Sequence, residues 1–133
     1  MINARDRRGR NNSFLIDQLD KVRIDGQFNR GDERLRELYT EARELAKGNS
    51  TTVFAISQAP ADAEGKTILD LSQLENSRTG KAAEADIMIG IGKEPMGERD
   101  SMVRSLCIPK NKINGWHGLV WVTLEQQLSR FKA

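Results

Sequence analysis

The stretch SFLIDQLDKV, residues 13–22, combines a short apolar run with carboxylates where the run ends. The run from Ser13 to Leu19 is too short for a helix of ordinary length, so it predicts a buried strand. Asp17 stands at the exit of that strand. Because ligands of parallel α/β sheets bind at the carboxyl ends of strands, this acid is a candidate site residue.

The residues that follow predict a helix and a second strand. Residues 32–47 place leucine, tyrosine and alanine at helical spacing, with glutamate and arginine on the other face. We expect Asp32 to cap this helix and Gly48-Asn49 to end it. The run TTVFAIS, residues 51–57, is typical of a strand covered on both faces. A strand, a helix and a strand in this order predict a right-handed parallel crossover.

The rest of the chain predicts one more parallel strand and a hairpin. Residues 59–80 are rich in proline, glycine, serine and aspartate and predict a long, mobile, functional loop. A short helix, KAAEA, leads into a third buried strand at residues 86–91. The runs SMVRSLCI and GLVWVTLE predict an antiparallel hairpin. The expected fold class is α/β, with about three parallel strands, a principal helix and the C-terminal hairpin.

Composition narrows the class of protein. The 133 residues are 38% hydrophobic and 30% charged, and they contain no stretch long enough for a membrane span, so we expect a soluble protein. Single Cys107 and His117 residues argue against disulfides, thiolate zinc sites and multi-histidine metal centres, and they favour a reducing cytoplasm. Residues 1–12 predict a basic, disordered leader. The net charge of +2 means that any nucleic-acid affinity must come from local clusters of basic residues.

Polar residues follow each predicted parallel strand: Asp17-Gln18, Ser57-Gln58 and Lys93-Glu94. An acid beside a nucleotide can hold Mg²⁺ directly or through water, and a neutral amide can sense the terminal phosphate. Strand ends are also polar simply because they meet water, and that alternative stays open.

The loop NSRTGKAAEAD carries a candidate contact for a nucleic-acid backbone. Arg78 and Lys81 flank a glycine, while Ser77 and Thr79 can add hydrogen bonds to phosphates. In the alternative interpretation, Ser77 or Thr79 caps the short helix and the two cations are solvated.

The hairpin tip KNKING presents Lys110 and Lys112, which could reach the phosphates of a neighbouring subunit. It could equally be a solvent-facing turn chosen for Asn114-Gly115, a dipeptide with a strong turn preference. His117 beside Trp116 is more typical of a packing histidine than of a catalyst.

The order of these parts resembles the second half of the RecA-like ATPase domain of replicative hexameric DNA helicases. The stretches that carry the resemblance are FLIDQLDKV, TTVFAISQ, ENSRTGKAAEADIMIGIGK and PKNKINGWHGLVWVTLEQQLSRF. The bacterial DnaB type and the phage primase-helicases are the most similar, and the match covers about residues 13–131. We therefore expect residues 13–133 to be a truncated RecA-like helicase domain that acts in DNA replication.

The resemblance implies roles for the candidate residues. Asp17 falls at the Walker B acid, which assists Mg²⁺, and Gln58 falls at the sensor of the terminal phosphate of ATP. The loop with Arg78 and Lys81 is similar to the one that tracks single-stranded DNA. Lys110 and Lys112 lie where the family offers a basic pair, usually with an arginine, to a neighbour's nucleotide. Lysine lacks the bidentate fork of arginine, which weakens that correspondence.

Helicases of this kind carry a GxxxxGK[ST] phosphate loop and a catalytic glutamate upstream of the Walker B strand, and this sequence contains neither before Asp17. We therefore expect the isolated chain not to hydrolyse ATP, and expect an oligomer in which a phosphate-loop half or neighbouring helicase subunits complete the site. The predicted gap in the sheet leaves two possibilities: the strands at 52–58 and 86–91 pair directly, or another chain supplies a strand between them.

Two other functions fit the same residues. The first is a non-catalytic module that binds single-stranded DNA or associates with a helicase. The second is a fragment of another RecA-fold ATPase, such as a recombinase, because these proteins share the Walker B strand and much of the later order of elements.

Overall fold

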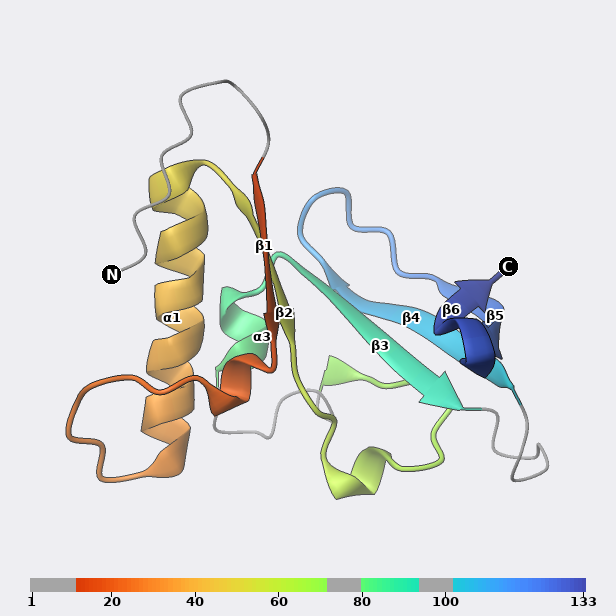
Figure 1. The fold of residues 1–133 in the computed structure, drawn as a ribbon, viewed down its shortest axis with the longest axis horizontal. Coiled ribbons are helices and arrows are strands. Elements are labelled where there is room, and N and C mark those ends of the chain that lie inside the picture. The colour runs from red at the N-terminus through yellow and green to blue at the C-terminus, as the bar shows by residue number, and fades with distance from the viewer. Residues whose placement is uncertain (1–11, 72–79, 94–101) are drawn as a thin grey trace. The chain divides into compact units, whose positions relative to one another are not determined.

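The computed structural model describes residues 12–71, 80–93 and 102–133 (Figure 1). The chain divides into two compact units. The first holds strands β1 and β2 with helices α1 and α3, and the second holds strands β3 to β6 with the segment that follows residue 58. The predicted leader lies outside the described residues, except for Asn12. In the described part, no helix has the length and apolar character needed to cross a membrane.

The first unit is built on a parallel β-α-β crossover. Strand β1 (Ser13–Asp17) pairs in parallel with β2 (Thr52–Ile56), and α1 (Gly31–Asn49) connects them along the chain. The register runs from Ser13 opposite Thr52 to Asp17 opposite Ile56. A single-turn 3₁₀ helix, η1 (Leu19–Lys21), follows β1, and the short helix α3 (Lys81–Glu84) packs against α1. The predicted parallel crossover is confirmed.

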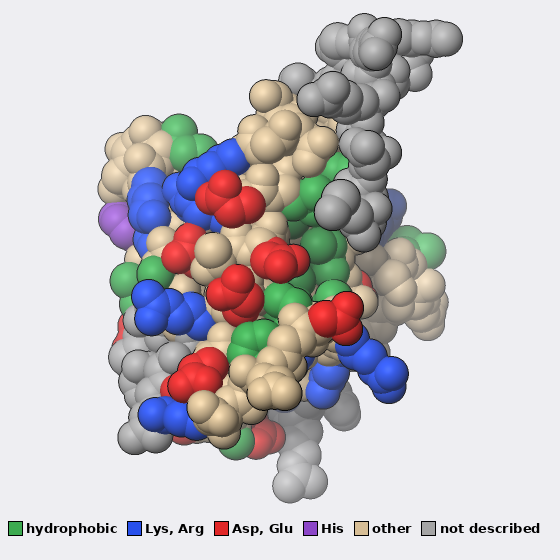
Figure 2. Space-filling model, turned by 90° about the vertical axis from the view of Figure 1, so that its left-hand side faces the viewer, with side chains coloured by type: hydrophobic (Ala, Val, Ile, Leu, Met, Phe, Trp, Pro, Cys, Tyr) green, Lys and Arg blue, Asp and Glu red, His purple; other side chains and the backbone are tan. Residues whose placement is uncertain are grey.

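Helix α1 forms where its periodicity predicts, and its ends differ slightly from the prediction. Asp32 lies inside the first turn, where its carboxylate pairs with Arg30 at 2.8 Å, and the helix begins without a side-chain cap. The left-handed residue at the end is Ser50, with φ of 50°, one residue past the predicted Gly48-Asn49. The outer side of α1 exposes Glu33, Glu37, Glu41 and Glu44, and Figure 2 shows carboxylates among basic side chains on this face.

The prediction that both faces of the first two strands are buried is wrong for the described residues. One face of the β1–β2 pair is open: Leu15 is 70% exposed, Phe54 is 56% exposed and Ile56 is 44% exposed. On the opposite face, Phe14, Ile16 and Val53 are half-buried, and Ala55 is exposed. A continuous apolar run indicates two faces that favour burial, but it does not supply the element that covers the second face.

The second unit is a four-stranded antiparallel sheet in the order β3-β4-β5-β6. Its strands are β3 (Ile87–Lys93), β4 (Val103–Asn111), β5 (Leu119–Glu125) and β6 (Arg130–Lys132), and a 3₁₀ turn, η3 (Gln126–Leu128), joins the last two. The predicted hairpin is confirmed as β4 and β5.

Of the about three expected parallel strands, β1 and β2 pair with each other, whereas β3 pairs antiparallel with β4 in a different sheet. The α/β class holds, with two parallel strands. An apolar strand does not encode its partner, and consecutive strands pair readily because a short connection suffices for antiparallel geometry. In the described sheets, β2 and β3 do not pair with each other, so the possibility of direct pairing is wrong.

The segment after residue 58 packs on the second sheet where the sequence predicts a mobile loop. It contains the 3₁₀ turn η2 (Ala61–Ala63), and Ala63, Leu69 and Cys107 form a buried cluster. The fully buried hydroxyl of Ser105 donates a hydrogen bond to the Thr67 carbonyl oxygen. Gly92 makes this approach possible, because a Cβ there would lie 2.5 Å from the Ser105 hydroxyl oxygen. Residues 72–79 of the predicted loop lie outside the described residues.

Candidate functional site

The carboxyl edge of the β1–β2 pair brings two predicted site residues to neighbouring positions. Asp17 is the last residue of β1 and lies opposite Ile56 in the parallel register. Gln58 follows Ile56 by two residues, and Asp17 and Gln58 are both exposed. Since the strands are parallel, the carboxylate and the amide belong to one edge of the sheet, where the sequence places a nucleotide site.

Next to this edge lies a compact polar network, here called the Asp20 cluster: Asp20, Tyr39, Ser57 and Lys81. The Lys81 ammonium lies 2.7 Å from one carboxylate oxygen of Asp20 and 2.7 Å from the Ser57 hydroxyl. The Ser57 hydroxyl donates to the same Asp20 oxygen at 2.7 Å, and the Tyr39 hydroxyl donates to the other at 2.8 Å. Lys81 also lies 5.5 Å above the Tyr39 ring, within range of a cation–π contact.

Burial makes these contacts strong. Lys81 is only 8% exposed, which is rare for a lysine without a charged partner. Burial alone would raise the pKa of Asp20, but hydrogen bonds from Lys81, Ser57 and Tyr39 outweigh it and hold that pKa below its ordinary value. Burial, together with the nearby Asp20 carboxylate, raises the pKa of the Tyr39 hydroxyl. The hydrogen bonds of the cluster therefore stabilise the charged form of the Asp20 carboxylate.

One residue of the predicted DNA-binding set, Lys81, belongs to the Asp20 cluster, and the sequence does not predict these contacts. Lys81 begins α3, as expected, yet its ammonium is engaged with Asp20 and Ser57. Whether Lys81 also contacts DNA stays a prediction. The other predicted DNA contacts, Ser77, Arg78 and Thr79, lie outside the described residues.

Sequence reasoning missed Asp20 and Tyr39. The signal for Asp20 is a second acid three residues after the strand-ending Asp17, and the signal for Tyr39 is a hydroxyl on the apolar face of α1. Neither signal identifies a partner, because Asp20 and Lys81 are 61 residues apart in the chain.

In the second unit, Lys110 and Lys112 lie at the end of β4 and in the turn after it. Lys112 is exposed, and its backbone N–H donates to the Asp86 carbonyl oxygen at 2.8 Å. The turn is shaped by amides: the Asn111 side-chain oxygen accepts from the backbone of Ile113 and Asn114 at 3.0 and 3.3 Å. The alternative of a turn built on Asn114-Gly115 fits this geometry, and Gly115 has the left-handed φ of 70°.

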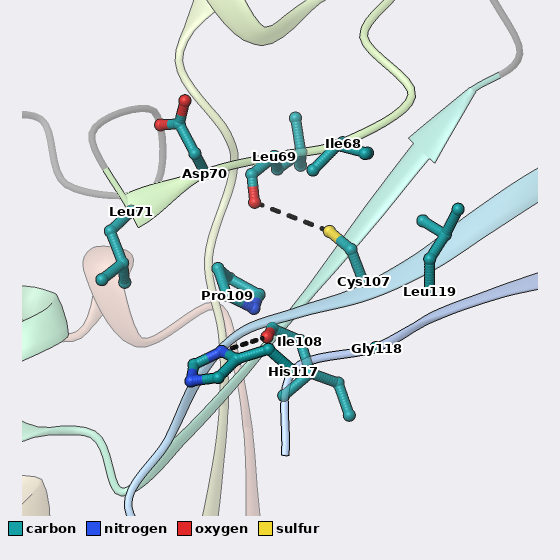
Figure 3. Close-up of a pocket in the computed structure, with 10 residues that line it drawn as sticks. All are labelled: Ile68, Leu69, Asp70, Leu71, Cys107, Ile108, Pro109, His117, Gly118 and Leu119. Atoms are coloured by element: carbon teal, nitrogen blue, oxygen red, sulfur yellow. Dashed lines mark hydrogen bonds between the residues drawn. The ribbon is translucent and has the colours of Figure 1, made fainter. Parts of the chain in front are cut away.

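The second unit also contains an open, mostly apolar pocket of about 730 Å³ between residues 68–71 and strands β4 and β5 (Figure 3). The buried thiol of Cys107 lies beneath the Leu69 carbonyl oxygen at 3.6 Å. The ring of His117, on the rim, is 3.0 Å from the Ile108 carbonyl oxygen through Nδ1. His117 is nevertheless exposed, which differs from the expectation of a packing histidine. Asp70 is the only acid among the lining residues.

A metal site made by the protein alone is absent from the described ranges, which hold no group of three or more His, Cys, Asp or Glu residues suited to a metal ion. One exposed carboxylate and a neighbouring amide are nevertheless the donors that Mg²⁺ uses when phosphates and water complete its coordination. The residues present at the β1–β2 edge therefore fit a magnesium–nucleotide complex better than a protein-enclosed metal.

No protein-family model matches the sequence, and no curated protein matches it. Solved structures do match. The ATPase domain of a DnaB-like helicase superposes with a TM-score of 0.80 at 18% identity, covering 92% of this chain and 44% of that one. A DnaB-like replicative helicase, solved to study its interactions with primase, superposes with a TM-score of 0.78 at 18% identity, covering 92% of this chain and 30% of that one.

These matches confirm the expected fold, which is that of part of the ATPase domain of DnaB-like helicases. The chain spans less than half the length of either matching structure.

Proposed function

We propose that this chain is a segment of an ATP-dependent replicative DNA helicase motor, with Asp17 as the Walker B acid and Gln58 as the phosphate sensor. The observation that carries the proposal is the parallel register, which puts Asp17 opposite Ile56 and leaves Gln58 at the same edge. The likeness in fold to the helicase ATPase domains supports it. The proposed setting is the cytoplasm.

In this proposal the chain orients Mg²⁺ and the terminal phosphate of ATP but does not supply every group that hydrolysis requires. Asp17 would hold Mg²⁺ through its carboxylate or through water, and the Gln58 amide would hydrogen-bond the terminal phosphate of ATP. Bound Mg²⁺ neutralises charge that develops on the phosphates during transfer. The sequence contains no GxxxxGK[ST] loop to cradle the β and γ phosphates, so hydrolysis requires that loop from another polypeptide segment.

The open face of the β1–β2 pair supports association with such a partner. Leu15, Phe54 and Ile56 expose apolar side chains on one face of two short strands, and Asp17 lies on the same face as Leu15. Exposed apolar groups that lie together favour burial against another surface. We infer that the phosphate-loop half, or a neighbouring helicase subunit, covers this face and completes the nucleotide site there.

Single-stranded DNA is the second proposed ligand. Arg78, with hydroxyls from Ser77 and Thr79, provides the contacts to the DNA backbone, and Lys81 joins them when its ion pair with Asp20 opens. In the second unit, Lys110 and Lys112 are proposed to approach the nucleotide of a neighbouring subunit as point charges, without the bidentate geometry of arginine.

The test of this function is ATP hydrolysis by the chain alone and by the chain mixed with a phosphate-loop-bearing polypeptide. We expect no hydrolysis by the chain alone and Mg²⁺-dependent hydrolysis by the mixture. Asp17→Asn should lower that rate by about 100-fold or more, because one preorganised charge at the reacting phosphates is worth that much. Asp25→Asn, a change of an exposed acid in the loop after β1, is the matched control.

Hydrolysis by the isolated chain, or an Asp17→Asn mixture that retains the full rate, would contradict the proposal. Salt-dependent DNA binding without any nucleotide binding in the mixture would instead identify the chain as a non-catalytic DNA-binding module.

A further inference from the structure

Two elements of the first unit converge on Ser57, the residue before Gln58. Asp20 comes from the turn after β1, Lys81 comes from the first residue of α3, and both contact the Ser57 hydroxyl at 2.7 Å. The ladder between β1 and β2 ends at Ile56, so Gln58 lies beyond the hydrogen bonds of the sheet. The side chain of Ser57 is therefore the link between the buried ion pair and the exposed Gln58.

Helix α3 is fixed well enough to act as an anchor. The Arg43 guanidinium from α1 donates to the Glu84 carbonyl oxygen and lies 3.8 Å from the Glu84 carboxylate. At its start, Gly80 adopts a left-handed φ of 62° and approaches the side chain of Arg36, so that a Cβ there would lie 3.3 Å from the Arg36 Cγ. Lys81 thus projects from a helix that is held at both ends.

We propose that Asp20 and Lys81 are positioning residues that hold Ser57, and through it Gln58, at the carboxyl edge of the β1–β2 pair. What Gln58 does there rests on the proposed function, whereas the positioning is a property of this chain alone. A displacement of about 1 Å in a group that orients a reacting phosphate costs up to about 100-fold in rate, so such a support is functionally significant.

The competing explanation is that the ion pair only stabilises the fold. Ser57→Ala separates the two, because it removes the link to Gln58 and leaves the Asp20–Lys81 pair in place. Lys81→Met removes the anchor itself, and Lys47→Met is the matched control, since Lys47 pairs with Glu44 on the surface of α1.

The first experiment needs no activity. In ¹⁵N-labelled full-length chain, Ser57→Ala and Lys81→Met should shift or broaden the side-chain amide signals of Gln58, while Lys47→Met should leave them in place. Unchanged Gln58 signals in a folded Ser57→Ala chain would overturn the proposal. If Lys81→Met fails to fold, Ser57→Ala still decides.

The second experiment measures the turnover number of the mixture with the phosphate-loop polypeptide. Ser57→Ala should lower the turnover number about 10-fold with little change in the KM for ATP, because an interaction used in the transition state is weakened. Ser57→Ala with Gln58→Ala should be no slower than Gln58→Ala alone, because Ser57 acts through Gln58. If Ser57→Ala lowered the turnover number of the Gln58→Ala mixture by the same factor as that of the unsubstituted mixture, the positioning role would be wrong. If the unsubstituted mixture is inactive, the proposed function fails, and the amide signals alone decide the positioning.

Discussion

The molecule contains two polar networks at the ends of strands, and they are built in opposite ways. The Asp20 cluster in the first unit buries a carboxylate and an ammonium, with side-chain exposures of 19% and 10%. The turn after β4 in the second unit is an exposed network of amides around Asn111 and Asn114. Buried charges depend on one another, because each would be costly alone, whereas exposed amides can exchange their partners for water.

This difference changes how a lysine in a loop should be interpreted. Lys81 and Lys112 both lie in segments that contain glycine and asparagine, and both are predicted to meet phosphates. The first is buried against Asp20, and the second is exposed at the hairpin tip. Charge and loop composition alone therefore do not distinguish a buried cation from an exposed one.

The largest expected effect comes from removing the buried cation. Lys81→Met should lower the free energy of unfolding by about 2–3 kcal/mol, because it leaves the half-buried Asp20 carboxylate without its charge partner. Urea denaturation followed by circular dichroism measures this change. Lys47→Met should leave the free energy of unfolding nearly unchanged, because both members of the Lys47–Glu44 pair are well exposed. Equal effects of the two substitutions would remove the distinction between buried and exposed networks.

A second prediction concerns pH. The pKa of Asp20 is lowered in the folded chain, so between that value and the ordinary value of 3.8 the unfolded chain binds the extra proton. The stability that the cluster contributes is therefore fully present above pH 3.8 and is lost as the pH falls through the folded pKa. Urea midpoints measured across this range should fall toward low pH.

Asp20→Asn should remove part of that pH dependence, since the substituted amide does not titrate. The effect on stability should be smaller than that of Lys81→Met, because the one oxygen of the amide can still accept a hydrogen bond from Ser57 or from Tyr39. An unchanged pH profile in the Asp20→Asn chain would show that other carboxylates carry the acid sensitivity.

The sequence predicts the parts of this fold that depend on local pattern. Helix α1 is predicted because its leucines recur at helical spacing, and the β4–β5 hairpin is predicted because Asn114-Gly115 suits the turn between two apolar runs. The strand order β1, α1, β2 also predicts the shared edge of Asp17 and Gln58, because parallel strands end at the same side.

The rest depends on contacts between distant residues. Lys81 is buried by its contacts with Asp20 and Ser57, which lie 61 and 24 residues away in the chain. No local pattern of charge indicates contacts between residues so far apart in sequence. Strand β3 is apolar whether it pairs with β2 or with β4, so its antiparallel partner could not be predicted. The open face of the β1–β2 pair was not predicted for the same reason. An apolar face favours burial, but it does not identify the element that buries it.

The smallest expected effect lies in the exposed network. Asn111→Ala removes the acceptor for the backbone of Ile113 and Asn114 and the donor to the Trp116 carbonyl oxygen. Because water can replace these partners, we expect a loss of about 1 kcal/mol in the free energy of unfolding, measured by the same urea titration. Asn111→Asp keeps the acceptor and should lose less. If Asn111→Ala were as costly as Lys81→Met, the turn would have to be a structural nucleus of the second sheet, and burial would not be what separates the two networks.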